Sequence, residues 1–287
     1  MSEELHRRPL RFELKHVIPL EAAQKLWKEL DIHCVPDEHA DPEFGYEVSS
    51  LYFDTRQLRF HRDCQESIGY RRKVRLRAYG AEGIHTPDFN NLSHPAKHRC
   101  AGLFMEIKEK HKHRVGKKRC KLINDAILTS HPDILNISID ELEQYMPPDH
   151  VATREILYLH KLLTLSPKAL IRYIRKSFAG KYEPGLRITL DYRITVGGRN
   201  LLNYDPAREK FIIPPTMGVL EIKSFGTIPI WLQNTLLRFE LSRTRMSKYC
   251  EGVITQSGKP MLSGVIPDCS ELSPDNLTGT DEEVGNY

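Results

Sequence analysis

The stretch R-K-V-R-L-R-A-Y-G at residues 72–80 decides the fold, because charged and apolar side chains alternate along it. Successive side chains of a β-strand point to opposite faces, so residues two apart share a face. A strand over Arg72–Tyr79 therefore separates three cations from three apolar side chains. The two sets are Lys73, Arg75 and Arg77 against Val74, Leu76 and Ala78. The apolar face needs a covering layer of protein, and the cationic face needs water or an anion.

The same alternation recurs in four other segments, which carry the charged sets Glu13 with Lys15, Glu106 with Lys108 and Lys110, Arg187 with Asp191, and Glu221 with Lys223. Seven strands are predicted in all, over Arg11–Ile18, Glu47–Phe53, Arg72–Tyr79, Leu103–Lys110, Ala169–Phe178, Gly185–Ile194 and Val219–Ser224. The basic segment between Lys110 and Leu122 is interpreted as a loop. A solvated face of an antiparallel sheet explains any one of these strands. Five strands with a cationic excess instead favour charged faces that converge inside a closed barrel.

Helices are predicted outside this barrel, where they would cover the apolar faces of the strands. Pro19 precedes apolar residues at three- and four-residue spacing, which is typical of an amphipathic helix. Ser138 and Glu141 have the spacing of a capping box, and further helices are predicted over Val151–Leu165 and Ile230–Leu241. The expected fold class is α+β.

Composition excludes several classes of protein. The chain has 287 residues, 40% hydrophobic and 28% charged, which suits a folded core, and no apolar run approaches the ~18 residues of a membrane span. Its polar start gives no signal peptide, so a cytoplasmic location is expected. The six cysteines form no C-x-x-C pair, so reduced thiols are expected. The formal charge of +4 divides into a basic body and an acidic, Ser- and Pro-containing end after Lys259 that is typical of a disordered tail.

Converging cations need a counter-charge. Two like charges ~6 Å apart repel by roughly 3 kcal/mol at an effective dielectric constant of about 20. Mixed Arg and Lys suit several phosphate groups in a row. Glu13, Glu106 and Glu221 fit among them as partners of the cations or as ligands of a hard divalent metal. The sequence contains no G-x-x-x-x-G-K-[ST] or G-x-G-x-x-G loop, so a phosphate site must be made from side chains.

Eight short motifs together resemble the VTC domain, the polyphosphate polymerase branch of the CYTH or triphosphate tunnel metalloenzyme superfamily. They are R-F-E-L-K at 11–15, S-L-Y-F-D-T at 50–55, R-K-V-R-L-R-A-Y-G at 72–80, F-M-E-I-K-E-K at 104–110, R-Y-I-R-K-S-F at 172–178, G-L-R-I-T-L-D at 185–191, L-E-I-K at 220–223 and S-K-Y at 247–249. The resemblance covers residues 9–255, and leaves an N-terminal extension over 1–8 and the acidic tail over 256–287. It implies an antiparallel eight-stranded β-tunnel with helices outside.

The resemblance also implies an activity, a metal-dependent transfer of the ATP γ-phosphoryl group to a growing polyphosphate chain. Glu221 is expected to hold Mn²⁺ or Mg²⁺, with Glu13 assisting, and Arg75, Arg77, Arg175 and Arg187 to fix the triphosphate. The full set of phosphate-holding cations carried over from the family is Lys15, Arg75, Arg77, Lys108, Arg175, Arg187, Lys223, Arg245 and Lys248. Two additional cations, Lys110 and Lys118, belong to the basic segment that follows Lys108. The family's membrane-spanning and SPX-type partner regions have no counterpart in this sequence, so a membrane partner that handles product is not identified.

The sequence leaves two other functions open and disfavours a third. A tunnel hydrolase, such as a tripolyphosphatase or thiamine triphosphatase, would use the same cations, although those relatives usually carry E-x-E-x-K on the first strand and this chain has Arg11 at the first glutamate position. A phosphate sensor would bind without reaction, and Glu221 argues against it because a sensor has little use for a metal ligand. Nucleic acid is not expected as a partner, because the aromatic residues, among them Tyr79 and Phe104, fall within strands where core packing is the commoner role.

Overall fold

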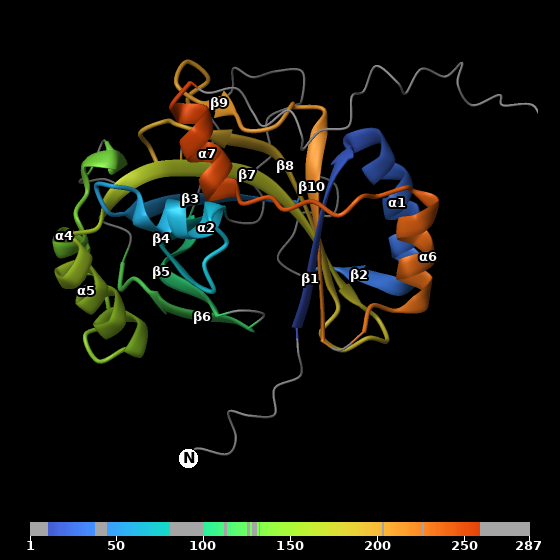
Figure 1. The fold of residues 1–287 in the computed structure, drawn as a ribbon, viewed down its shortest axis with the longest axis horizontal. Helices are drawn as coiled ribbons and strands as arrows, with labels where there is room; N and C mark the ends of the chain where they lie inside the picture. Colours follow the sequence, from blue (N-terminus) through green and yellow to red (C-terminus); the bar gives the residue numbers. More distant parts are fainter. Residues whose placement is uncertain are drawn as a thin grey trace, which may run out of the picture.

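The computed structural model describes residues 11–37, 45–80, 100–111, 114–124, 127, 131, 133–202, 204–225 and 227–258. The expected extension over 1–8 and the acidic tail from residue 259 lie outside these ranges. Within them the chain forms one antiparallel sheet with helices packed on its outer surface (Figure 1). The predicted α+β antiparallel class is therefore confirmed.

The sheet contains every strand predicted from the sequence, each within a few residues of the expected limits. Its strands are β1 (Arg11–Pro19), β2 (Cys34–Pro36), β3 (Tyr46–Asp54), β4 (Tyr70–Gly80), β5 (Cys100–His111), β6 (Arg114–Lys121), β7 (Ser166–Gly180), β8 (Arg187–Val196), β9 (Lys210–Phe211) and β10 (Met217–Phe225). The hydrogen-bonded order is β1-β10-β8-β7-β3-β4-β5-β6, with β2 beside β7 and β9 beside β8. The loop interpretation between Lys110 and Leu122 is wrong, because that basic segment pairs with β5 as β6.

The sheet curves until its two ends approach each other, without closing a continuous ring of hydrogen bonds. Among the described strands, β1 and β6 end the order and are not paired with each other. Even so, the Lys108 Nζ atom on β5 lies 3.8 Å from Glu13 Oε2 on β1, across the concave face. The curved sheet therefore surrounds a charged interior, and the predicted eight-stranded path is present as an open barrel.

Two helical layers cover the apolar outer face, at opposite sides in Figure 1. On one side α1 (Leu20–His33) and α6 (Ile230–Arg238) share a buried cluster with outward side chains of β8 and β10, among them Ile188 and Leu220. On the other side α4 (Ile139–Glu143) and α5 (Val151–Leu163) share a cluster with β4 and β5, among them Leu76 and Met105. The apolar residues that alternate with the cations thus face outward beneath helices, as the pattern predicts.

The sequence signals for two of these helices are confirmed locally. Pro19 precedes α1, which buries Ala23, Leu26 and Leu30 along one face. Before α4, Ser138 Oγ accepts a hydrogen bond from the Glu141 amide at 3.1 Å, and Glu141 Oε2 accepts one from the Ser138 amide at 2.8 Å. This reciprocal bonding satisfies donors that a short helix otherwise leaves free.

The helix α7 (Lys248–Gln256) packs differently, because it covers the inner apolar side chains at one end of the curved sheet. Tyr249 and Cys250 belong to a buried cluster with Ile171 of β7 and Val219 of β10. Gly252 allows this approach, since a Cβ atom there would lie 2.3 Å from Ile171 Cδ1. The sequence did not predict α7, nor α2 (Arg59–Gln65), which packs against it. No described helix is long and apolar enough to cross a membrane.

Candidate functional site

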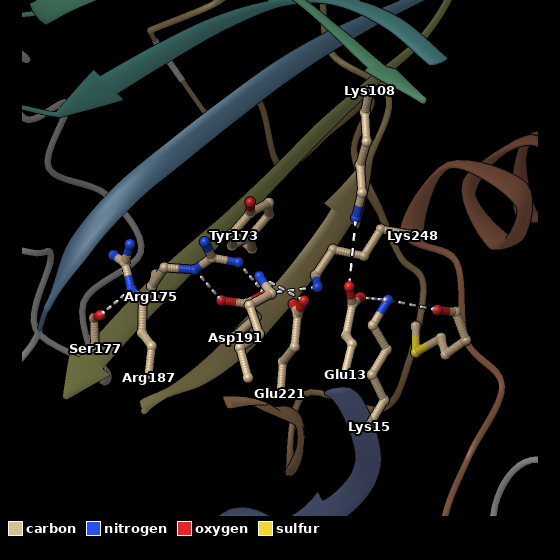
Figure 2. Close-up of polar contacts among 12 residues, drawn as sticks. Glu13, Lys15, Lys108, Tyr173, Arg175, Ser177, Arg187, Asp191, Glu221 and Lys248 are labelled. Carbon is tan, nitrogen blue, oxygen red and sulfur yellow. Dashed lines mark hydrogen bonds and ion pairs between the residues drawn. The ribbon is translucent and has the colours of Figure 1, made fainter. Parts of the chain in front are cut away.

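The concave face of the sheet gathers charged side chains from seven of the described strands and from the start of α7. Figure 2 shows this row, in which side chains of β1, β10, β8 and β7 point toward Lys108 of β5 and Lys248 of α7. The cations are paired with carboxylates on the same face. Seven of the nine predicted cations are brought together here: Lys15, Arg75, Arg77, Lys108, Arg175, Lys223 and Lys248.

The β1–β10 pair supplies two carboxylates at the centre of the row. In its register Glu13 lies opposite Lys223, and Lys15 lies opposite Glu221. Lys15 Nζ is 3.2 Å from Glu13 Oε1, and Lys223 Nζ is 2.7 Å from Glu221 Oε1. Burial raises the pKa of Glu221, but the surrounding cations, Lys15 first, lower it well below its usual value. The buried Glu221 side chain is therefore ionised at neutral pH.

Glu13 and Glu221 fit a divalent metal. Their carboxylates are close enough to interact directly, and each raises the electrostatic cost of charge on its neighbour. Mg²⁺ and similar hard cations commonly take one or two carboxylates from the protein and complete their shell with phosphate oxygens and water. No group of three or more His, Cys, Asp and Glu ligands occurs among the described residues. The protein thus offers a two-carboxylate site rather than a complete metal cage.

Asp191 on β8 organises two of the predicted cations, and it was not among the predicted site residues. Its carboxylate accepts from Arg175 Nε at 2.6 Å and from Arg175 Nη2 at 2.7 Å, and Lys248 Nζ lies 2.6 Å away. Although burial raises the pKa of Asp191, Arg175 and Lys248 lower it to about 2. The sequence did carry one signal for Asp191: it lies four residues after Arg187 in the same strand, and therefore on the same charged face.

Glu106 on β5 holds a second group of cations. Its carboxylate accepts from Arg75 Nε at 2.8 Å and lies 3.4 Å from Lys117 Nζ and 3.7 Å from Arg77 Nη1. Burial raises the pKa of Glu106, and the three cations lower it to about 2. Of the two roles open to Glu106 in the sequence, the structure shows it as a partner of cations.

Tyrosine hydroxyls complete the arginine contacts, and none of these tyrosines was a predicted site residue. Arg75 Nη1 donates to Tyr52 Oη at 3.0 Å, and Arg77 Nη2 donates to Tyr173 Oη at 3.2 Å. The Tyr173 ring also lies beneath Lys248, whose Nζ atom is 5.0 Å from the ring centroid. Such contacts fix each cation in one orientation while leaving donors for a ligand.

Lys108 differs from its neighbours because it approaches Glu13 only at 3.8 Å. Burial lowers the pKa of Lys108 to about 7, and Lys15 and Lys223 add to this, while Glu13 and Glu221 oppose it. Lys108 is thus held near its titration point at neutral pH. An anion bound beside it would favour the charged form.

The remaining predicted cations lie at the margin. Arg187 is partly exposed and donates to Ser177 Oγ at 3.1 Å and to Asp37 Oδ2 at 2.9 Å, at one end of the row in Figure 2. Arg245 is exposed in the segment before α7. These two residues stay predictions for phosphate contact.

The two additional cations, Lys110 and Lys118, lie on different faces of the sheet. Lys110 follows Lys108 on the concave face of β5. Lys118 is wrong as an inner residue, because it points to the outer helix α5 and lies 2.5 Å from Glu155 Oε2. The neighbouring positions Lys117 and Arg119 face inward instead, toward Glu106 and Phe104. The register of β6 explains this, since a shift by one residue exchanges the two faces.

A family model described as the VTC domain matches residues 10–256 of the chain. The chain belongs to the VTC domain family. This assignment rests on the family model, which covers the whole described sheet and its helices.

Solved structures with low identity are also similar to this VTC domain chain. The PH1819 protein from Pyrococcus horikoshii OT3 is 12% identical, with 86% of this chain and 99% of that one covered and a TM-score of 0.44. HpAC1 from Hippeastrum, named as an adenylyl cyclase and said to have a dominant triphosphatase activity, is 15% identical, with 86% and 96% covered and a TM-score of 0.45. No curated protein matches the sequence.

Proposed function

We propose that this VTC domain protein is an ATP-dependent polyphosphate polymerase. Its donor would be ATP, its acceptor the end of an inorganic polyphosphate chain, and its cofactor Mn²⁺ or Mg²⁺. The same proposal includes a cytoplasmic location, where ATP is abundant. It includes no nucleic acid among the partners. Family membership supports the coarser statement, that the chain is a tunnel-type enzyme acting on phosphates.

One observation carries the proposal furthest: the paired carboxylates Glu13 and Glu221 lie within a wall of oriented cations. Cations alone would serve a phosphate sensor. Two ionised carboxylates facing the same space repel phosphate, so they suit a site in which Glu13 and Glu221 would hold a divalent cation. When bound, such a cation would neutralise charge on the phosphate oxygens.

The residues can divide the triphosphate among themselves by position. Arg175 and Lys248 meet at Asp191, and Arg75 and Arg77 meet at Glu106. Each pair keeps donors beyond its carboxylate, so phosphate groups can bridge the two pairs. Phosphoryl transfer passes through a loose, in-line transition state, and its catalysis depends mainly on positioning and charge neutralisation.

The nucleophile needs no protein base. A terminal phosphate oxygen of the acceptor, already deprotonated at neutral pH, would attack the γ-phosphorus of ATP while the bond to the β–γ bridging oxygen breaks and ADP leaves. In a hydrolase, water would attack instead and would need a proton acceptor. Arg11, in place of the first glutamate of the hydrolase motif E-x-E-x-K, favours the polymerase.

The test is incubation of the purified protein with ATP and Mn²⁺, followed by gel analysis for polyphosphate and assay of free phosphate. Wild-type protein should form polymer, and Glu221→Gln should form none while keeping its melting temperature within a few degrees. Glu143→Gln changes an exposed carboxylate on α4 and serves as the matched control.

Three results would contradict the polymerase. Free phosphate without polymer would assign the hydrolase reaction. Binding of tripolyphosphate without any product would assign a sensor. If Glu221→Gln formed polymer at the wild-type rate, the carboxylate pair would not be needed for the reaction.

A further inference from the structure

A cluster outside the phosphate-facing row joins two cysteines that are 186 positions apart in the sequence. Cys64 lies in the last turn of α2 and Cys250 in the first turn of α7, and the two helices are packed together. Both cysteines belong to one apolar contact cluster with Tyr249. Their side chains are close enough to interact, and neither cysteine is in a disulfide.

Two polar side chains complete the cluster. Lys73 Nζ, from the cationic face of β4, donates to Ser247 Oγ at 2.7 Å. The Cys250 amide donates to the same oxygen at 3.3 Å, so Ser247 caps α7 beside the thiol pair. The ammonium group of Lys73 therefore lies near the cysteines and stabilises negative charge there.

The two thiols have unequal character. A hydrogen bond from Cys250 lowers the pKa of Cys64, and Lys73 and Arg71 contribute in the same direction against the effect of burial. Contact with the Cys64 sulfur and burial raise the pKa of Cys250. Cys64 is also partly exposed, whereas Cys250 is buried. A low-pKa, accessible thiolate beside a second thiol is the arrangement that reacts with oxidants.

We propose that Cys64 and Cys250 form a modification site at which a hydroperoxide converts the two thiols to a disulfide that links α2 to α7. In the first step the Cys64 thiolate attacks one peroxide oxygen, the O–O bond breaks, and the other oxygen leaves as an alcohol or as water after taking a proton. Sulfur is oxidised to sulfenic acid and the peroxide is reduced. In the second step the Cys250 sulfur attacks the Cys64 sulfur, and the hydroxyl group leaves as water with the Cys250 proton.

This site touches the row of cations without being part of it. Lys73 shares the strand face of Arg75 and Arg77, and Cys250 follows Lys248 by two residues. A disulfide would fix α7 to α2 at the point from which Lys248 enters the concave face. The site stands on the thiol pair alone and does not depend on which phosphate reaction the protein performs.

The test uses the full chain with Cys100→Ser and Cys269→Ser, which leaves four cysteines, two of them the deeply buried Cys34 and Cys120. Hydrogen peroxide at pH 7 should lower the intact mass by two hydrogen atoms, and peptide mapping should join Cys64 to Cys250. In Cys250→Ser, a sulfenic acid should form at Cys64 and be trapped by dimedone. In Cys64→Ser, Cys250 should give no such adduct.

Lys73→Gln should slow the reaction of Cys64 by about tenfold at pH 7, because the fraction of thiolate falls. Lys28→Gln on α1 should leave the rate unchanged and is the matched control. A disulfide between other cysteines, or a Cys64 that reacts no faster than Cys34, would overturn the proposal. Circular dichroism spectra of each variant, recorded before oxidation, show whether the variant is folded. A folded variant that does not react has lost the site and not the fold.

Discussion

Two arginines of the concave face lie directly opposite their carboxylate on the neighbouring strand. Arg75 pairs with Glu106 across β4 and β5, and Arg175 pairs with Asp191 across β7 and β8. Such cross-strand pairs stabilise the sheet by roughly 0.2–1 kcal/mol each. This pairing is not general, since Lys108 lies opposite Lys73 on β4 and opposite Lys117 on β6. Lys73 turns away to Ser247, and Lys108 is left as the cation most easily deprotonated.

Lys108 therefore makes anion binding depend on pH. With a pKa of about 7 in the free protein, its charge is present below pH 7 and is lost as the pH rises. The affinity for tripolyphosphate should weaken from pH 6 to 8.5 by up to about tenfold relative to Lys108→Arg, which stays charged throughout. Isothermal titration of both proteins gives this ratio and cancels the titration of the anion itself. A constant ratio would show that Lys108 remains protonated.

Glu106 makes folding depend on pH in the acid range. Its pKa is about 2 in the folded protein and 4.5 in an unfolded chain, so the unfolded state binds more protons between these values. Its contribution is complete above about pH 4.5 and disappears as the pH falls toward 2. Protonation of Glu106 should therefore lower the free energy of unfolding by about 3 kcal/mol.

The free energy of unfolding from urea titrations should accordingly fall less between pH 5 and pH 3 in Glu106→Gln than in wild type. At pH 7 the variant should be the less stable protein, because Arg75 loses a buried ionic partner. Glu143→Gln should follow the wild-type curve. Parallel curves for Glu106→Gln and wild type would show that Glu106 titrates normally.

At the scale of elements, α7 is held by a buried hydrogen bond. Tyr249 Oη donates to Asp54 Oδ2 at 2.6 Å, and the Tyr249 ring stacks on Tyr52 with centroids 4.9 Å apart. Asp54 also accepts from the amides of Phe60 and His61 at the start of α2. One carboxylate thus ties both helices to the end of β3.

Removal of this hydroxyl should loosen α7. Tyr249→Phe should lower the free energy of unfolding by about 1–3 kcal/mol, since a buried charged acceptor loses a donor. It should also weaken tripolyphosphate binding, because Lys248 follows the position of the helix. Tyr158→Phe, on the exposed face of α5, should change neither quantity. Unfolding energies equal to wild type would mean that water replaces the hydroxyl.

The elements predicted correctly are those whose own sequence carries a strong period. β4 alternates over Lys73–Ala78 and β5 over Met105–Lys108, and the outward Leu76 and Met105 follow from that alternation. In β6, R-V-G-K-K-R-C-K has few apolar side chains, and the strand forms because the edge of β5 offers backbone partners. In α7, Gly252 opposes helix formation in the sequence, and burial of Tyr249 outweighs it.

The residues of the site were also predictable only where the sequence of their own strand alternates strongly. Cations on strongly alternating strands were predicted at the correct face, whereas Lys118 was not, because a strand of nearly uniform charge has no readable register. The orienting role of Asp191 was not predictable, since it depends on β7 and on α7 meeting at one carboxylate. Cross-strand partners become visible only once the strand order is known.

At the scale of the whole molecule, the carboxylates offset only part of the cationic charge, and a polyanion should stabilise the fold. Tripolyphosphate at 100 times its dissociation constant should add about 2.7 kcal/mol to the free energy of unfolding. The resulting rise in melting temperature should shrink as NaCl increases from 50 to 500 mM, because salt screens the interaction. Arg175→Gln should show a smaller rise at every salt concentration. A rise independent of salt would contradict an electrostatic site.

The order of strands also sets the order in which the chain can fold. Among the described strands β1 has one neighbour, β10, and their pairing joins residue 11 to residue 225. Contacts so distant in sequence are slow to form. On a ribosome β1 must wait, without this partner, until β10 has been synthesised. Glu13 and Glu221, the proposed metal ligands, would then meet only at a late stage of folding, so partly folded chains would carry a basic sheet without this carboxylate pair.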